Sequence, residues 1–172
     1  EGDVLTKEIF NVCPDWSIRE LSNYMQGSCS KLLLEVLHSG SGFDEKRVKQ
    51  EDAGITYAAK LTRRDAYVNF EHSGSQIYNQ WRALRDHYGL VFSWKGKKLI
   101  VWDMKWQPSD SNMEPGRIRI DGYGFMGLEL KGGVAGLIEI QLEGKKRMPV
   151  KQFLAGAQLR DGDFIQVYEE EF

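Results

Sequence analysis

The residues of this sequence that are best suited to a chemical role are lysines and arginines clustered at expected turns and linkers. Long cationic side chains at such positions can reach phosphate groups, because a turn leaves them outside the packed core. The clustered residues are Lys60, Arg63, Arg64, Lys95, Lys97, Lys98, Lys145, Lys146 and Arg147. Their grouping favours binding of a polyanion, and a solvated surface of mixed charge is the alternative interpretation.

Three aromatic residues are candidates for stacking on bases beside these cations. Trp94, Trp106 and Tyr123 lie near expected turns or strand ends, where an exposed ring can offer a face to a nucleobase. A place in the core is the alternative for each of them. The remaining aromatic residues mostly follow the apolar faces of expected helices and strands, so we assign them to the core.

The charge of the chain is distributed unevenly. Residues 1–44 carry three Lys and Arg against seven Asp and Glu, whereas residues 45–168 carry twenty against fifteen. The net charge is therefore −4 for the first stretch and +5 for the second, and three glutamates at 169–171 complete the overall −2. A basic domain between acidic ends is a mild indication of a polyanionic partner.

Other chemistries find little support in the sequence. His38, His72 and His87 are scattered and have no metal-ligand spacing with Cys or carboxylates. Nucleophile elbows, phosphate-binding loops and dinucleotide fingerprints are lacking, and Cys13 and Cys29 are too few for a disulfide framework. No apolar run approaches the roughly 18–20 residues of a membrane span. We expect an intracellular protein with no metal, no membrane segment and no self-sufficient active site.

The beginning of the chain predicts one strand and one long helix. Residues 1–9 are typical of a turn that enters a strand, which would pair outside this chain or at the edge of the main domain. Ser17 and Glu20 form a capping box, and apolar residues recur at three- and four-residue intervals from there to about His38, which predicts a helix with one apolar face. The Ser-Gly-Ser-Gly run at 39–42 indicates a flexible linker.

A charged loop and a second helix are expected before the first of the short strands. Residues 44–53 are charged and predict an exposed loop. Residues 74–88 place their apolar side chains on a narrow arc, and Gly89 is suited to end that helix.

Short segments with alternating apolar residues follow, separated by glycine turns, and the Lys95-Gly96 turn between the first two suggests a hairpin. The expected strands are 91–94, 98–106, 117–120, 125–130, 137–143 and 163–168, with a short helix from Pro149 to Ala155. In the fifth strand the alternation places Ile138, Ile140 and Leu142 on one buried face. The fold class is mainly β with helices (α+β): a small OB-like antiparallel barrel, of the oligonucleotide/oligosaccharide-binding type, with a flat sandwich as the alternative.

Several of these segments, in this order, resemble the methionyl-tRNA formyltransferase family. The matching segments are Tyr-Ala-Ala-Lys-Leu at 57–61, Leu-Ile-Val-Trp at 99–102, Pro-Gly at 115–116, Gly-Lys-Lys-Arg-Met at 144–148, Gln-Phe-Leu at 152–154 and Leu-Arg-Asp-Gly-Asp at 159–163. The order and spacing of these segments make the resemblance specific.

The resemblance implies a division into three parts. Residues 1–38 would be the last strand and helix of an α/β catalytic domain, residues 39–62 a linker, and residues 63–172 the C-terminal OB-like barrel. Gly-Asp-Val-Leu at 2–5 resembles the end of a family motif whose catalytic Asp would precede Glu1. The chain would then lack the catalytic residues and the folate site of its N-terminal catalytic domain, and would be inactive alone.

By resemblance, the parent enzyme formylates methionyl initiator tRNA with 10-formyltetrahydrofolate, in the bacterial cytoplasm or the mitochondrial matrix. Its barrel and linker would help to bind the acceptor arm and backbone of the tRNA. Lys60, Lys145 and Lys146 match family motifs, whereas the other six basic residues are candidates from charge placement alone.

Two departures from the family pattern leave alternatives open. Arg-Asp-His-Tyr-Gly at 85–89 replaces a usual Asn-Pro-Trp-Pro, and Tyr-Val-Asn-Phe at 67–70 replaces a usual Arg-Ile-Asp-Trp. A related formyltransferase acting on a nucleotide sugar, or a non-catalytic barrel used as a binding module, are the alternatives.

Overall fold

The computed structural model describes residues 2–43, 47–51, 53–110 and 112–169. By its internal contacts the chain divides into two compact units, residues 1–60 and residues 61–172, and each is described by itself.

The first unit contains one long helix. Helix α1 spans Ile18–Ser39, and the predicted capping box begins it, with the Ser17 N–H donating to Glu20 Oε2 at 2.8 Å. No residue of α1 is buried. A short 3₁₀ helix, η1, spans Gly40–Phe43, within the segment predicted as a linker.

The predicted N-terminal strand is reduced to a single bridge. Val4 pairs with Val48, with N–H to carbonyl distances of 2.8 and 3.0 Å, and residues 5–12 have no regular structure. Instead this segment contacts α1 through its side chains. The Glu8 carboxylate accepts hydrogen bonds from the Ser28 and Tyr24 hydroxyls, and the Phe10 and Tyr24 rings lie 4.5 Å apart.

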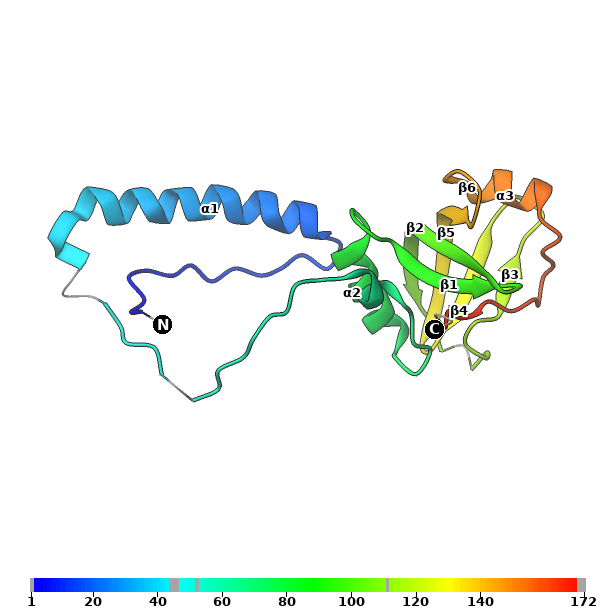
Figure 1. The fold of residues 1–172 in the computed structure, drawn as a ribbon, viewed down its shortest axis with the longest axis horizontal. Coiled ribbons are helices and arrows are strands. Elements are labelled where there is room, and N and C mark those ends of the chain that lie inside the picture. The colour runs from blue at the N-terminus through cyan, green and yellow to red at the C-terminus, as the bar shows by residue number, and fades with distance from the viewer. Residues whose placement is uncertain (1, 44–46, 52, 111, 170–172) are drawn as a thin grey trace. The chain divides into compact units, whose positions relative to one another are not determined.

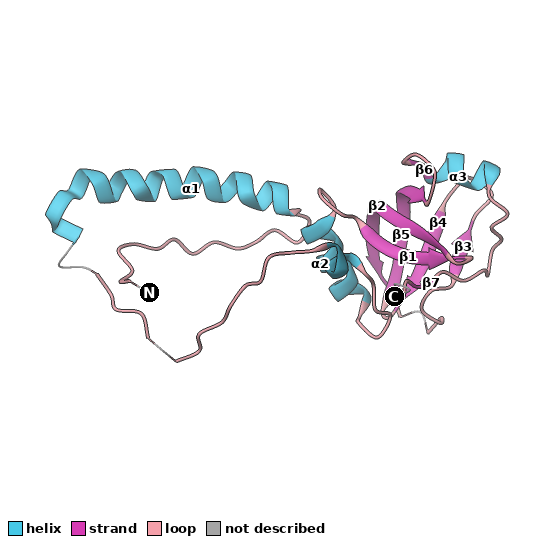
Figure 2. Ribbon diagram, in the orientation of Figure 1, coloured by secondary structure: helices cyan, strands magenta, loops and turns pink. Residues whose placement is uncertain are grey.

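The second unit is built on an antiparallel sheet (Figures 1 and 2). Among the described residues its strands are β1 (Leu90–Trp94), β2 (Lys97–Pro108), β3 (Ile118–Ile120), β4 (Met126–Leu130), β5 (Gly133–Leu142), β6 (Met148–Pro149) and β7 (Gln166–Val167). The strand order is β3-β4-β5-β2-β1-β7, and β6 pairs with β5. Its helices are η2 (Arg63–Ala66), α2 (Gly74–Leu84) and α3 (Val150–Gly156).

The end of the chain curls the sheet toward a closed barrel. β7 pairs with β1, and the residues just before it pair with the other edge: the Ile118 N–H donates to the Asp163 carbonyl at 2.7 Å and the Ile165 N–H to the Gly116 carbonyl at 2.8 Å. A Cβ on Gly116 would lie 2.5 Å from the Ile165 carbonyl oxygen, so this closure requires a glycine there. The expected small barrel-like domain is confirmed.

A bulge between β2 and β5 explains one wrong prediction. Val101 pairs with Ile140 and Met104 with Leu137, with register shifts on either side of Asp103. Because a bulge changes which residues face inward, Leu137 and Ile140 are both buried, and Ile138 is exposed. The simple alternation expected for 137–143 therefore fails at Ile138.

Helix α2 ends earlier than predicted. The Leu84 carbonyl accepts hydrogen bonds from the N–H groups of His87, Tyr88 and Gly89 at 3.0, 2.9 and 3.1 Å. Because three successive N–H groups share one acceptor, the regular hydrogen bonding of the helix ends here. Gly89 has φ +64° and ends the turn that follows α2, whereas it was predicted to follow the helix directly. Helix α2 packs on the sheet, and its Trp81 Nε1–H donates to the Trp102 carbonyl at 3.2 Å.

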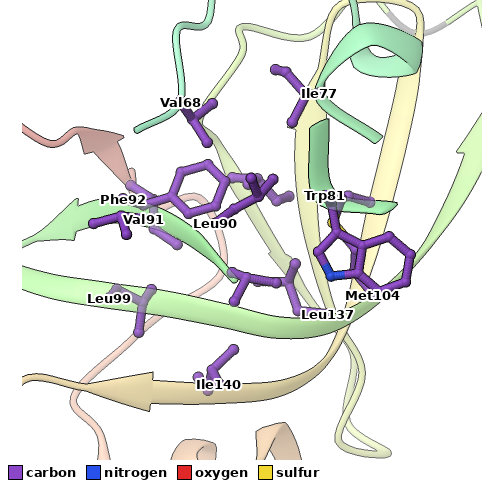
Figure 3. Close-up of a cluster of buried hydrophobic side chains, with 14 of the residues drawn as sticks. Val68, Ile77, Trp81, Leu90, Val91, Phe92, Leu99, Met104, Leu137 and Ile140 are labelled. Atoms are coloured by element: carbon purple, nitrogen blue, oxygen red, sulfur yellow. The ribbon is translucent and has the colours of Figure 1, made fainter. Parts of the chain in front are cut away.

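The core lies between α2 and the concave face of the sheet (Figure 3). Its buried side chains include Val68, Ile77, Trp81, Leu90, Phe92, Leu99, Met104, Leu137 and Ile140. The hydrophobic packing of this core holds the outer turns and loops, which carry the basic residues, on a rigid frame.

Candidate nucleic-acid interface

The structure places the nine predicted basic residues on the surface. Lys60 belongs to the first unit and the other eight to the second. Eight of the nine are exposed, and Lys98 is half-buried. In the second unit, Lys95 and Lys145 line a pocket beside the β1–β2 hairpin, and Arg63 of η2 and Lys98 of β2 line another.

Lys95 and Lys145 meet at a pocket beside the β1–β2 hairpin, here called the hairpin pocket. Lys95 (φ +51°) and Gly96 (φ +73°) form the predicted two-residue turn, both in the left-handed region that such hairpins need. The pocket has a volume of about 460 Å³, and Trp94, Met148 and Phe153 supply apolar walls. Two residues fifty positions apart in the sequence are thus brought to one place.

Hydrogen bonds fix both basic turns of the hairpin pocket. The Lys95 ammonium lies 4.8 Å from the centre of the Trp94 ring and donates to the Gln158 carbonyl at 3.1 Å. The Lys145 N–H donates to the Leu142 carbonyl at 2.9 Å, and its own carbonyl accepts from the Gln141 amide at 3.0 Å. These backbone and side-chain bonds order the turns on which the exposed ammonium groups are presented.

Arg160 is a basic residue that the clustering of charges in the sequence did not reveal. It lines a neighbouring pocket of about 390 Å³, together with Lys95 and Asp163. The Arg160 N–H donates to Asp163 Oδ2 at 2.9 Å, which closes the turn. Arg160 stands alone among acidic and small residues in the sequence, and only the fold brings it beside Lys95.

Arg147 has partners within the protein. It forms an ion pair with Glu139, and its guanidinium lies 5.0 Å from the centre of the Trp102 ring. The Trp102 indole N–H in turn donates to Gln141 Oε1 at 3.0 Å. The Arg147 charge is therefore matched by Glu139, and its position is fixed against Trp102.

Arg63 and Lys98 line a second pocket, here called the aromatic pocket. It has a volume of about 320 Å³ and its polar and aromatic lining is Arg63, Tyr67, His87, Tyr88, Lys98 and Trp102. None of its aromatic residues was predicted as a binding residue, because strand and helix patterns assigned them to the core.

Helix η2 presents Arg63 and Arg64 from a capped turn. The Thr62 N–H and hydroxyl donate to Asp65 Oδ2 at 2.6 and 2.8 Å. The backbone hydrogen bond from Thr62, followed by that of its side chain, lowers the pKa of Asp65. The ionised carboxylate thus holds the turn at neutral pH.

Of the three predicted stacking residues, only Tyr123 is fully exposed. Trp94 is buried at 8% exposure and packs edge-on against Phe153, so its prediction as an open surface was wrong. Trp106 is half-buried and approaches Gly74 and Gly133. Tyr123 is 92% exposed, on a turn in which Asp121 accepts its N–H at 2.9 Å.

Metal and membrane sites find no support in the described part of the chain. It contains no group of three or more His, Cys, Asp and Glu side chains that would hold a metal ion. None of the helices in these described ranges has both the length and the apolarity for crossing a membrane.

Comparisons with known proteins point to one family. Residues 60–158 match the family described as formyl transferase, C-terminal domain. The methionyl-tRNA formyltransferase of Acidobacterium capsulatum is 34% identical over 158 residues, which cover 90% of this chain and 50% of that protein. The methionyl-tRNA formyltransferase of Caldicellulosiruptor saccharolyticus is 31% identical, with 95% and 53% covered.

The chain thus spans about half the length of the curated relatives that it matches. Among solved structures, a variant of HypX from Aquifex aeolicus has a similar fold, with a TM-score of 0.64 at 16% sequence identity. That alignment covers 99% of this chain and 34% of HypX.

Proposed function

The chain belongs to the formyl transferase C-terminal domain family, and on this premise we propose that it is the tRNA-positioning part of a methionyl-tRNA formyltransferase. Similarity to curated methionyl-tRNA formyltransferases over 90–95% of the chain supports this proposal. The parent enzyme would transfer a formyl group from 10-formyltetrahydrofolate to methionyl initiator tRNA, in the bacterial cytoplasm or the mitochondrial matrix.

The observation that carries the tRNA role is the meeting of Lys95 and Lys145 at the hairpin pocket. Both lysines lie on ordered turns and line this pocket, and Arg160 lines the neighbouring pocket together with Lys95. Lys97, the first residue of β2, and Lys146 are exposed directly after these turns. A group of cations on one part of a surface can neutralise several phosphates of one RNA at once, which isolated charges cannot.

These cations suit phosphates rather than base edges. Lysine is a flexible point charge that makes few shape-specific contacts, so it neutralises phosphates and contributes little to sequence recognition. The domain would thus hold the tRNA body through its backbone, with a contribution from Lys60 in the linker. Arg147 would contribute less than the lysines, because Glu139 already matches its charge.

The chain alone would be inactive in formyl transfer. By family resemblance, the folate site and the catalytic residues belong to the N-terminal catalytic domain, which would contact the reacting amino group. Incubation of the chain with 10-formyltetrahydrofolate and methionyl initiator tRNA should give no formylmethionyl product, and product formation would contradict this.

The tRNA role is tested by binding measurements with a double variant in which two lysines are replaced by neutral glutamines. Lys95→Gln with Lys145→Gln should weaken binding of initiator tRNA at low salt by about tenfold or more, since two phosphate-binding ammonium groups are removed. Lys105→Gln is the matched control, because Lys105 is exposed on β2 and lines neither pocket. Equally weakened binding in both variants, or no binding by the unaltered chain, would contradict the proposal.

A further inference from the structure

The aromatic pocket is a hollow that the positioning role does not explain. Its floor comes from the outer face of β2, where Lys98, Ile100 and Trp102 alternate with inward-facing core residues. Arg63 and Tyr67 come from η2 and the residue after it, and the turn after α2 supplies the opposite wall. Its volume of about 320 Å³ lies at the lower end of the range for small-molecule sites, roughly 300–1,000 Å³.

The walls of the aromatic pocket are ordered before any ligand arrives. His87 and Tyr88 are held by the hydrogen bonds of their N–H groups to the Leu84 carbonyl. Gly89 brings that turn so close to β2 that a Cβ on it would lie 2.8 Å from the Val101 carbonyl oxygen. A site with fixed walls loses little conformational entropy on binding, which favours a specific ligand over loose surface contacts.

The charge of the pocket selects an anion. Arg63 and Lys98 are cationic, whereas the described residues that line the pocket include no carboxylate. Lys98 is also held from outside the pocket lining, because its ammonium lies 4.7 Å from the centre of the Tyr168 ring. An aromatic lining with a net positive charge fits a ligand that is both planar and negatively charged.

We propose that the aromatic pocket binds one unstacked nucleotide. Its base would lie among Tyr67, Tyr88 and Trp102, and its phosphate against Arg63 and Lys98. If the proposed tRNA role holds, this nucleotide belongs to RNA. Only the choice of RNA as the source rests on that role. A free mononucleotide offers the same chemistry and is the other source.

The test follows the Trp102 indole N–H signal of the ¹⁵N-labelled chain by NMR during titration with short RNA. The probes are a single-stranded tetranucleotide, an abasic oligomer with the same number of phosphates, and adenosine monophosphate. The tetranucleotide should shift the Trp102 signal and bind about 5- to 100-fold more tightly than the abasic oligomer, because only the former can stack. Equal affinities for the tetranucleotide and the abasic oligomer, with no shift of the Trp102 signal, would overturn the proposal.

Two variants locate the effect in the pocket. Lys98→Gln should weaken binding of the tetranucleotide and the abasic oligomer alike, since it removes a phosphate partner. Tyr88→Leu, which keeps an apolar side chain against the core, should weaken binding of the tetranucleotide alone. Lys105→Gln should change neither, and a Tyr88→Leu variant that retains the full preference for bases would overturn the proposal.

The outcomes separate this inference from the proposed function. Suppose that the Lys95 and Lys145 variant loses tRNA binding, and that the unaltered chain binds the tetranucleotide no more tightly than the abasic oligomer. These results would support the positioning role and overturn the proposed nucleotide site. A Trp102 shift with adenosine monophosphate as strong as with RNA would support the pocket and identify a free nucleotide as its ligand. Tighter binding of RNA would support the pocket and identify RNA.

Discussion

Replacing Gly74 by alanine should destabilise the second unit, against the usual effect of this change. Glycine to alanine in a helix normally stabilises by roughly 0.5–1 kcal/mol. Here a Cβ on Gly74, the first residue of α2, would lie 1.9 Å from Cη2 and 2.5 Å from Cζ3 of Trp106. The same end of the indole also lies close to Gly133, where an added Cβ would be 2.8 Å from Cη2, so the ring is packed against two glycine positions. We expect a decrease of about 1–3 kcal/mol in the free energy of unfolding, as for other overpacked sites.

A double-mutant cycle tests this cause. Trp106→Leu removes the ring that causes the clash, so Gly74→Ala should be neutral or stabilising in that background, with a coupling energy of about 1–3 kcal/mol. Gly156→Ala in α3 is the matched control, since no atom lies within 4 Å of its added Cβ. Gly133→Ala should not be rescued, because its Cβ also meets the Gln107 carbonyl oxygen at 2.3 Å.

Urea unfolding followed by tryptophan fluorescence gives the free energies for this cycle. A shift of α2 would also displace the turn that carries Tyr88, so Gly74→Ala should lower the affinity of the aromatic pocket for its nucleotide. The reasoning is refuted if Gly74→Ala is as stable as the unaltered chain. It is also refuted if Gly74→Ala lowers the free energy of unfolding by the same amount in the Trp106→Leu background.

Three further predictions concern the elements that support the sites. Ser73→Ala removes the N-cap oxygen that accepts the Gln76 N–H at 3.2 Å and should cost about 0.5–2 kcal/mol in urea unfolding. Phe92→Ala empties a fully buried position and should cost about 3–5 kcal/mol by the same assay. Because the pKa of Asp65 is lowered in the folded chain, its stabilisation of η2 should be present above the usual aspartate range and disappear as the pH falls through the lowered value. The amide signal of Thr62 should report this step, and a step that persists in Asp65→Asn would contradict the assignment.

Local sequence signals predicted the elements whose ends are set by side chains near them. The capping box at Ser17 and Glu20, the turn at Lys95 and Gly96, and the start of α3 after Pro149 all agree with the structure. Each depends on residues a few positions apart, which a linear pattern contains.

Elements that depend on distant partners were predicted poorly. The N-terminal segment has the composition of a strand, but only Val4 finds a pairing partner in the described chain, Val48. Ile138 has the right spacing for the core, but the bulge opposite Asp103 turns it outward. Strand β6 was missed because its two residues pair only through the position of β5.

The surface position of the basic residues was predictable from the sequence, but their grouping was not. Composition identified Lys95 and Lys145 as candidates, whereas their meeting at one pocket, and the arrival of Arg160 beside them, follow from the closure of the sheet. The aromatic pocket was not predicted, because the periodic patterns assigned Tyr88 and Trp102 to the core-facing sides of a helix and a strand. Only the fold shows that both line a hollow.

The salt dependence of tRNA binding tests the central claim most directly. The logarithm of the binding constant of initiator tRNA should fall linearly with the logarithm of salt concentration. Lys95→Gln with Lys145→Gln should reduce that slope by about one for each phosphate that is no longer neutralised, roughly two in all, whereas Lys105→Gln should leave it unchanged. A slope that is the same in all three proteins, or no binding at low salt, would contradict a phosphate-binding surface at the hairpin pocket.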